Sequence, residues 1–285
     1  MPFKAACAGI APDKADVGVN LDKIAEASLQ AVRESVDLLL FPETVVSGYF
    51  LEGGVLESSL TADELCAALG QRLGKLPRPL DIALGFYERK DGNLYNSAAY
   101  LEFGPDGPRV VRTYHKFFLP TYGVFDEERF VARGRDLCVF ESRFGRIALL
   151  ICEDVWHSML PSLCAVAGAQ ILLVPAASPG RGLHGETIDN LDRYQRLFRS
   201  ISEEHGIFCL NAQLCGFEGG KGLSGGSMIV DPFGTMLASG PLLDEHLIIA
   251  DIDVDMVGIA RAASPLVADL QTLWSDIQRL VSELP

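Results

Sequence analysis

Short apolar runs alternate along the chain with longer amphipathic segments. The runs at residues 3–10 and 37–43 are continuous enough for strands buried on both faces. Between them, residues 20–35 carry apolar side chains at helical spacing behind Asn20, a candidate N-cap. The pattern therefore predicts a strand, a helix and a second buried strand at the start of the chain.

The rest of the chain continues this alternation. Turn signals separate consecutive strands after a second helix near residues 62–74, and pairs of strand and helix return in the middle. The further strands are expected at 81–89, 96–103, 109–115, 146–154, 170–178, 207–213, 227–234 and 246–253, and the further helices at 158–167, 187–205 and in an apolar tail over 263–285. No linker divides the chain, so we expect one domain, 1–285, with helix layers covering mixed sheets.

Composition and charge narrow the class of protein. Of the 285 residues, 48% are hydrophobic and 22% charged, which is enough to bury a core and excludes a disordered chain. The formal net charge is −14, whereas nucleic acids and anionic membranes are bound by clustered Lys and Arg. No apolar run reaches the roughly 18 residues of a membrane span. We therefore expect neither nucleic acid nor a membrane as a partner.

The seven cysteines point to a reducing compartment. Their number is odd and no Cys-x-x-Cys pair occurs, which is typical of free thiols. The first residues form a short mixed run with one Lys, too weak for a secretory signal. A cytoplasmic location is the expectation.

No sequence motif for binding a metal ion or a cofactor has the spacing that such a site requires. The five histidines form no H-x-x-x-H pair and no ligand-spaced cluster with cysteine. Residues 216–222 miss the phosphate-loop spacing by one residue, and no dinucleotide fingerprint occurs. We expect no metal and no cofactor.

Three apolar runs end on a residue that is able to do chemistry: Glu43, Cys152 and Ser178. Ligands of α/β folds gather at the carboxyl ends of strands, so these residues could converge on one crevice. The alternative is that each is an ordinary polar residue at the end of a strand, where loops are commonly polar.

Several motifs are similar to those of one family. They are residues 41–43 (FPE), 114–120 (YHKFFLP) with 122–130 (YGVFDEERF), 151–154 (ICED) and 225–234 (GGSMIVDPFG). In this order they resemble the nitrilase (carbon–nitrogen hydrolase) superfamily over nearly the whole chain. The resemblance implies an α/β (α+β) fold of four layers, an α-β-β-α sandwich, with a Glu-Lys-Cys triad and neither metal nor cofactor.

The resemblance assigns roles to the triad. Cys152 would be the nucleophile, because a thiolate is the most nucleophilic side chain available. Glu43 would be the general base, and Lys116 would stabilise the oxyanion together with the backbone N–H of Glu153. The alternatives are a buried hydrophobic Cys152, a solvated or capping Glu43 and an exposed Lys116.

Other candidates surround this triad. Glu127 lies eleven positions after Lys116, where some members of the family place a second glutamate. Glu128 is the adjacent competitor, and both could belong to a solvated charged turn. The candidate substrate-binding residues, which could equally serve packing, are Tyr122, Glu153, Trp156 and Ser178.

Within the superfamily, residues 152–154 and 119–125 look most like the glutamine-amidase domains of NAD synthetases. The 285 residues leave no room for the ATP-using synthetase half of those enzymes. Residues 179–182 also depart from the Asn-Gly-Ser expected of a glutaminase site. Arg181 in this segment could bind a substrate carboxylate, or could be a solvated loop residue.

The sequence thus predicts an amidase that hydrolyses a small-molecule amide to carboxylate and ammonia through a cysteine thioester. Two alternatives stay open: a glutaminase subunit that supplies ammonia to a separate ATP-dependent synthetase, such as NAD synthetase, and a non-catalytic binding module on the same fold. Members of the family commonly pair sandwich to sandwich, so we expect a homodimer or higher homo-oligomer, with the apolar tail packing between copies.

Overall fold

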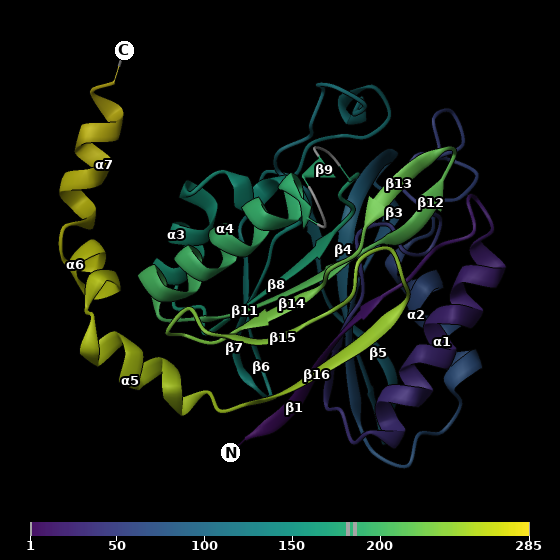
Figure 1. Cartoon of the computed structure of the whole chain (residues 1–285), viewed down its shortest axis with the longest axis horizontal. Coiled ribbons are helices and arrows are strands. Elements are labelled where there is room, and N and C mark those ends of the chain that lie inside the picture. The colour runs from purple at the N-terminus through teal and green to yellow at the C-terminus, as the bar shows by residue number, and fades with distance from the viewer. Residues whose placement is uncertain (1, 181–182, 185–186, 285) are drawn as a thin grey trace.

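Two six-stranded sheets lie face to face, with helices on their outer sides (Figure 1). The structure is a computed structural model that describes residues 2–180, 183–184 and 187–284. The layers follow the order helix, sheet, sheet, helix, which confirms the predicted α-β-β-α sandwich.

The first sheet has the strand order β16-β1-β2-β3-β4-β5. Strands β1, β2 and β3 are parallel, and the remaining neighbours are antiparallel. The last strand of the chain therefore pairs with the first. The bounds are β1 Phe3–Gly9, β2 Leu38–Leu40, β3 Leu80–Lys90, β4 Asn93–Gly104, β5 Gly107–His115 and β16 His246–Ile252.

The second sheet has the order β15-β14-β11-β8-β7-β6, with β7, β8 and β11 parallel at its centre. Two short hairpins, β9–β10 and β12–β13, lie outside the large sheets. The bounds are β6 Cys138–Ser142, β7 Gly145–Leu149, β8 Ile171–Ala176, β9 Leu183–His184, β10 Thr187–Ile188, β11 Phe208–Gln213, β12 Cys215–Glu218, β13 Lys221–Ser224, β14 Met228–Val230 and β15 Met236–Ser239.

Helices α1 and α2 cover the first sheet, and α3 and α4 cover the second (Figure 1). At the end of the chain, α6 packs against α3 and α4, whereas α7 has no buried residue and extends away from the sandwich. In the described part of the chain, no helix combines the length and the apolar character that crossing a bilayer requires. The bounds are α1 Val17–Arg33, α2 Ala62–Leu73, α3 Met159–Val166, α4 Asp189–His205, α5 Asp255–Ala263, α6 Leu266–Thr272 and α7 Trp274–Ser282, with 3₁₀ turns η1 Glu127–Arg129 and η2 Cys152–Trp156.

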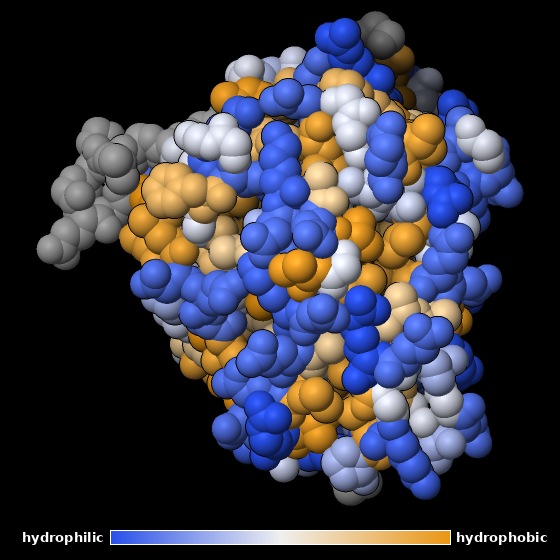
Figure 2. Space-filling view, turned by 90° about the vertical axis from the view of Figure 1, so that its right-hand side faces the viewer, coloured by the Kyte–Doolittle hydropathy of each residue, from blue (hydrophilic) through white to orange (hydrophobic). Residues whose placement is uncertain are grey.

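The core is divided by the first sheet. On β1, Ala5 and Cys7 belong to the cluster that fills the space between the sheets, whereas Ala6 and Ala8 belong to the cluster under α1 and α2. Successive side chains of a strand point to opposite faces, so a strand buried on both sides needs a continuous apolar run. Towards solvent, the side of the molecule that carries α1 and α2 is mainly hydrophilic, with scattered hydrophobic areas (Figure 2).

Several predicted boundaries are wrong. The N-cap of α1 is Asp16, whose side chain accepts from the backbone N–H of Val19, while Asn20 is buried inside the helix and bonds to the backbone of Asp13 and Val46. The strand expected over 146–154 ends at Leu149, before the 3₁₀ turn η2. The tail expected as one helix is divided between α6 and α7, and the pattern gave no sign of β6, β12, β13, β15 or α5.

Candidate active site

Glu43 lies just beyond β2, at the carboxyl end of the buried run that the sequence singled out. The backbone N–H of Phe41 donates to the Ala83 carbonyl at 2.8 Å, and that of Gly85 to the Pro42 carbonyl at 3.0 Å, so pairing with β3 continues up to Glu43. A Cβ on Gly85 would lie 2.5 Å from the Glu43 Cα. Glycine at this position lets the two backbones touch, and the Glu43 side chain is fully buried.

Lys116 follows β5, an edge strand of the first sheet, and its side chain reaches Glu43, which follows the interior strand β2. Its Nζ lies 2.7 Å from Oε1 of Glu43 and 2.7 Å from Oε1 of Glu127. Asn96 on β4 donates to the same Glu43 oxygen at 2.8 Å. Burial acts to lower the pKa of Lys116, but Glu127 and Glu43 outweigh it and hold this pKa well above its usual value. Lys116 is therefore a fixed positive charge, 1% exposed.

Glu127 is the second carboxylate on Lys116. The 3₁₀ turn η1 presents it inward at 5% exposure, and Tyr49 donates a hydrogen bond from its hydroxyl to Oε1. Burial raises the pKa of Glu127 to about 7, with Lys116 opposing and Glu43 adding to the effect. Glu128 points instead to solvent and pairs with Arg133 at 2.8 Å. The structure thus brings Glu127, not Glu128, to Lys116.

Cys152 opens the 3₁₀ turn η2, beyond the end of β7. Its φ of +46° is a backbone conformation rare for a residue with a Cβ, and the residue is 7% exposed. Burial raises the pKa of its thiol well above the usual value, and Glu43 adds to the increase, while Lys116 acts to lower it. All seven cysteines are free and buried, so burial does not distinguish Cys152; its charged neighbours and strained backbone do.

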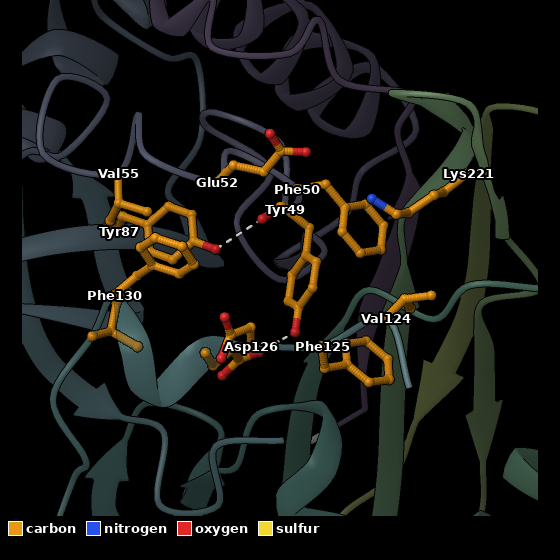
Figure 3. A pocket seen from close by; sticks show the side chains of 12 residues that line it. Tyr49, Phe50, Glu52, Val55, Tyr87, Val124, Phe125, Asp126, Phe130 and Lys221 are labelled. Carbon is orange, nitrogen blue, oxygen red and sulfur yellow. Dashed lines mark hydrogen bonds between the residues drawn. The ribbon is translucent and has the colours of Figure 1, made fainter. Parts of the chain in front are cut away.

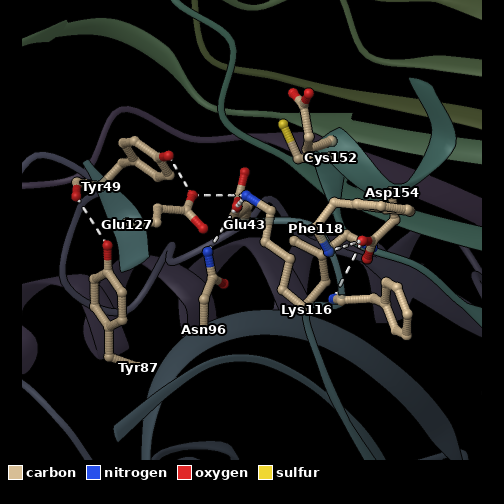
Figure 4. A network of polar contacts seen from close by, with 12 residues as sticks. Glu43, Tyr49, Tyr87, Asn96, Lys116, Phe118, Glu127, Cys152 and Asp154 are labelled. Atoms are coloured by element: carbon tan, nitrogen blue, oxygen red, sulfur yellow. Dashed lines mark hydrogen bonds and ion pairs between the residues drawn. The ribbon is translucent and has the colours of Figure 1, made fainter. Parts of the chain in front are cut away.

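Asp154 joins the turn of Cys152 to the strand of Lys116. Its buried carboxylate accepts from the backbone N–H of Phe118 at 2.8 Å (Figure 4). It also accepts from the backbone N–H of Ile151 at 3.0 Å and from the Tyr114 hydroxyl at 2.8 Å. Burial raises its pKa to about 6, although these bonds act to lower it. Ile151, which precedes the thiol, and Phe118, which follows the lysine, thus both donate to the Asp154 carboxylate. This shared acceptor fixes the distance between the two segments.

The candidate substrate-binding residues lie around Cys152 at different depths. Tyr122 is 51% exposed, and its hydroxyl donates to the Glu153 carboxylate at 2.9 Å. Trp156 is half-buried, and Ser178 is 4% exposed at the end of β8. Trp156 packs edge to face against Tyr194, whose hydroxyl lies 3.2 Å from the Cys152 sulfur. Arg181 lies outside the described residues.

A mostly apolar pocket lies beside Glu127. Its walls include Tyr49, Tyr87 and Phe130, and Glu127 contributes to its lining (Figure 3). Figure 4 shows Tyr49, Glu127, Lys116 and Cys152 in this order across the site. Cys152 does not line the pocket, so the pocket lies behind Glu127 as seen from the sulfur.

Sequence reasoning missed four contributors: Tyr49, Asn96, Asp154 and Tyr194. Asn96 and Tyr49 hold the oxygens that bind Lys116, and the Tyr194 hydroxyl lies 3.2 Å from the Cys152 sulfur. Asp154 had a signal, because an acidic residue two positions after Cys152 is placed to cap the start of the 3₁₀ turn. The other three carry no local pattern and become visible only where strands and helices meet.

Comparison with known proteins identifies the family. A family model for carbon–nitrogen hydrolases matches residues 4–262. The chain belongs to the carbon–nitrogen hydrolase family. The match spans Glu43, Lys116, Glu127 and Cys152, as the resemblance implied.

Two kinds of carbon–nitrogen hydrolase are similar to the chain. The glutamine-dependent NAD(+) synthetase of Thermotoga maritima is 30% identical over 249 residues, which cover 86% of this chain and 41% of that protein. The structure of glutamine-dependent NAD+ synthetase from Acinetobacter baumannii superposes with a TM-score of 0.78 at 25% identity, covering 90% of this chain and 47% of that one. The chain thus spans less than half the length of these relatives.

The other kind is a short amidase. The nitrilase-superfamily amidase of Nesterenkonia sp. AN1 has a TM-score of 0.73 at 26% identity, with 92% of this chain and 95% of that chain covered. One structure of that amidase shows the acetamide moiety of fluoroacetamide added covalently at its active-site cysteine. The present chain is accordingly a hydrolase of the carbon–nitrogen type.

Proposed function

We propose that the protein is an amidase that hydrolyses a small primary amide to carboxylate and ammonia, with Cys152 as nucleophile. The observation that carries this proposal is the buried cluster of Glu43, Lys116 and Glu127 beside Cys152. Charges this deeply buried are costly unless they serve a purpose, and perturbed pKa values gather at functional sites. Covalent addition at the cysteine of the similar amidase supports the same chemistry here.

Glu43 is suited to move the protons of this reaction. Its Oε1 is held by Lys116 and Asn96, whereas its Oε2 is buried and has no hydrogen-bond partner among the described residues. One oxygen is therefore fixed and the other is open to the thiol or to the substrate. A general base needs this combination of orientation and access.

Acylation begins when the Cys152 thiol passes its proton to Glu43 and the sulfur attacks the amide carbon. The carbonyl electrons move to oxygen, where Lys116 and the backbone N–H of Glu153 stabilise the negative charge. The C–N bond then breaks, the proton on Glu43 passes to nitrogen, and ammonia leaves a thioester on Cys152.

Deacylation repeats these steps with water. Glu43 takes a proton from water, the oxygen attacks the thioester carbon, the C–S bond breaks, and the proton returns to the sulfur. The sum is one amide and one water converted to one carboxylic acid and one ammonia. Glu127 orients Lys116 throughout through the contact at 2.7 Å.

The rim of the site suggests how the substrate is held. We propose that the substrate pocket around the nucleophile is formed by Glu153, Tyr122, Trp156 and Ser178. The Glu153 side chain is 15% exposed and accepts a hydrogen bond from Tyr122, which orients it at the entrance.

The test is ammonia release from a panel of primary amides, ω-amides, carbamyl amino acids and nitriles. The wild type should release ammonia from at least one primary amide, and Cys152→Ala should abolish this release without unfolding the protein. Cys164→Ala is the matched control, because Cys164 is equally buried but lies on α3. Unchanged turnover in Cys152→Ala would refute the mechanism.

A second candidate function is a glutaminase that supplies ammonia to an ATP-dependent synthetase. The similarity to part of the NAD(+) synthetase from Thermotoga maritima favours it. This candidate predicts glutamine as the best substrate of the panel and co-purification with an ATP-using chain. If neither ammonia release nor selective alkylation of Cys152 occurs, the protein is a binding module on the same fold.

A further inference from the structure

A tyrosine hydroxyl lies on the sulfur of the nucleophile. The Tyr194 oxygen is 3.2 Å from the Cys152 Sγ, within hydrogen-bonding range for sulfur, and Tyr194 is 1% exposed. Tyr194 belongs to α4, which covers the second sheet, whereas Glu43 and Lys116 follow strands of the first sheet. The first sheet thus supplies the charged groups near the sulfur, and the helix layer over the second sheet supplies a neutral hydroxyl.

The neighbours of Tyr194 decide which way its hydroxyl points. The side chains of Ser178 and Trp156 both act to lower the pKa of Tyr194, so both lie near its phenol. The two rings of Trp156 and Tyr194 meet edge to face at 4.9 Å. An indole N–H is a donor only, so Trp156 cannot accept the hydroxyl proton of Tyr194. The single O–H of Tyr194 is then available to the sulfur.

We propose that Tyr194 is a catalytic residue that donates its hydroxyl hydrogen bond to the Cys152 thiolate. This inference rests on the proposed function, because it concerns the thiolate that attacks the amide. When the thiol proton moves to Glu43, negative charge remains on a buried sulfur, and the Tyr194 hydroxyl stabilises it. When the C–S bond forms, the charge moves to the carbonyl oxygen, and Tyr194 has kept its own proton throughout.

The pKa shifts of Tyr194 and Cys152 agree with a hydrogen bond donated by the hydroxyl to the thiolate. Burial raises the pKa of Tyr194 well above its usual value, and the neighbouring Cys152 adds to the increase, so the phenol stays protonated. For Cys152, burial and Glu43 oppose the thiolate, whereas Lys116 and the Tyr194 hydrogen bond favour it. Lys116 is already shared between two carboxylates at 2.7 Å. Because two carboxylates hold Lys116, it stabilises the thiolate less, and the Tyr194 hydroxyl supplies a separate hydrogen bond to the sulfur.

The experiment measures alkylation of Cys152 by iodoacetamide as a function of pH, with the modified peptide identified by mass spectrometry. Tyr194→Phe keeps the ring against Trp156 and removes only the hydroxyl. Hydrogen bonds to charged groups are worth about 10- to 100-fold in an equilibrium. The variant should therefore be alkylated about 10- to 100-fold more slowly at neutral pH, with its pH midpoint raised, and kcat/KM for ammonia release should fall by a similar factor.

Tyr100→Phe is the matched control, because it removes another buried hydroxyl, bonded to Asp81 at 2.7 Å, away from the thiol. It should leave the alkylation profile of Cys152 unchanged. If Tyr194→Phe does not fold, 3-fluorotyrosine at position 194 serves instead, since its more acidic hydroxyl should lower the pH midpoint. A profile identical to wild type in the folded variant overturns the role of Tyr194. Absence of ammonia release from wild type would instead overturn the proposed function.

Discussion

At the scale of single residues, the site is a lysine held between two carboxylates in a dry interior. With all three groups ionised the cluster carries one net negative charge, which burial disfavours. The pKa of Glu127 rises to about 7 as a result, with burial as the largest cause. The reaction benefits because Lys116 keeps its charge and Glu43 keeps one free oxygen.

The raised pKa of Glu127 makes stability depend on pH. In the folded protein Glu127 has a pKa of about 7 and keeps its proton up to that pH, whereas an unfolded glutamate loses it near the ordinary pKa of 4.5. The folded state thus holds more protons in this window, so the contribution of Glu127 to stability is fully present below pH 4.5 and is lost as pH rises to about 7. Glu127→Gln should remove this dependence.

Urea unfolding of the wild type and Glu127→Gln at pH 5 and pH 7 measures the effect. The wild type should lose more unfolding free energy between the two pH values than the variant does. Asp154, whose pKa is about 6, contributes equally to both proteins and cancels in the difference. Equal losses in the two proteins would contradict the assignment. Glu128→Gln is the control, because Glu128 is exposed and paired with Arg133.

At the scale of elements, the close contact between β3 and the segment after β2 places the general base. Gly85 on β3 touches the backbone of Glu43 and Thr44, each 2.5 Å from the position of an added Cβ. Both contacts are backbone atoms, which cannot rotate away as a side chain could. The glycine therefore sets the position of Glu43 relative to Lys116.

Gly85→Ala should separate these two segments. We expect a loss of about 1–3 kcal/mol in unfolding free energy from overpacking. We also expect roughly a 100-fold loss of kcat, because a displacement of about 1 Å in a catalytic group has this effect. Urea unfolding and ammonia release are the measurements.

Gly104→Ala is the matched control. Gly104 is the last residue of β4, and a Cβ added there would meet no atom within 4 Å. It should change neither quantity appreciably. Wild-type activity in Gly85→Ala would show that Glu43 is not held by this contact.

The pattern of apolar residues predicted most helices and most strands of the large sheets, because each buries a continuous run or a periodic face. It failed for β6, β15 and the hairpin β12–β13. These are short and half exposed or lie at sheet edges, so few of their positions must be apolar. It also extended the strand before Cys152 too far, because Leu150 and Ile151 are apolar and fully buried although they lie beyond the end of β7.

At the scale of the whole molecule, the end of the chain projects from the sandwich (Figure 1). Helices α6 and α7 leave several large apolar side chains exposed: Leu266, Leu273, Leu280, Val281 and Leu284. Exposed apolar surface of this extent is typical of an interface. We propose that it packs against a second copy of the chain.

This proposal predicts a homodimer of the 30.9 kDa chain at micromolar concentration, measured by light scattering coupled to size exclusion. The double substitution Leu280→Asp with Val281→Asp should shift the mass to that of a monomer. Val19→Asp is the control, because Val19 is 41% exposed on α1, away from the tail. A monomeric wild type would refute the proposal.

The sequence by itself determined the family, the layered α/β class and the triad candidates. These depend on local motifs and on the periodicity that burial imposes on a strand or helix. Tertiary structure decided which glutamate meets Lys116, and it brought Tyr49, Asn96 and Tyr194 to the site. The contacts of Tyr49, Asn96 and Tyr194 join residues 42 to 78 positions apart, as between Cys152 and Tyr194 or Tyr49 and Glu127. No local pattern encodes such distances, because only the packing of sheet on sheet and helix on sheet creates them.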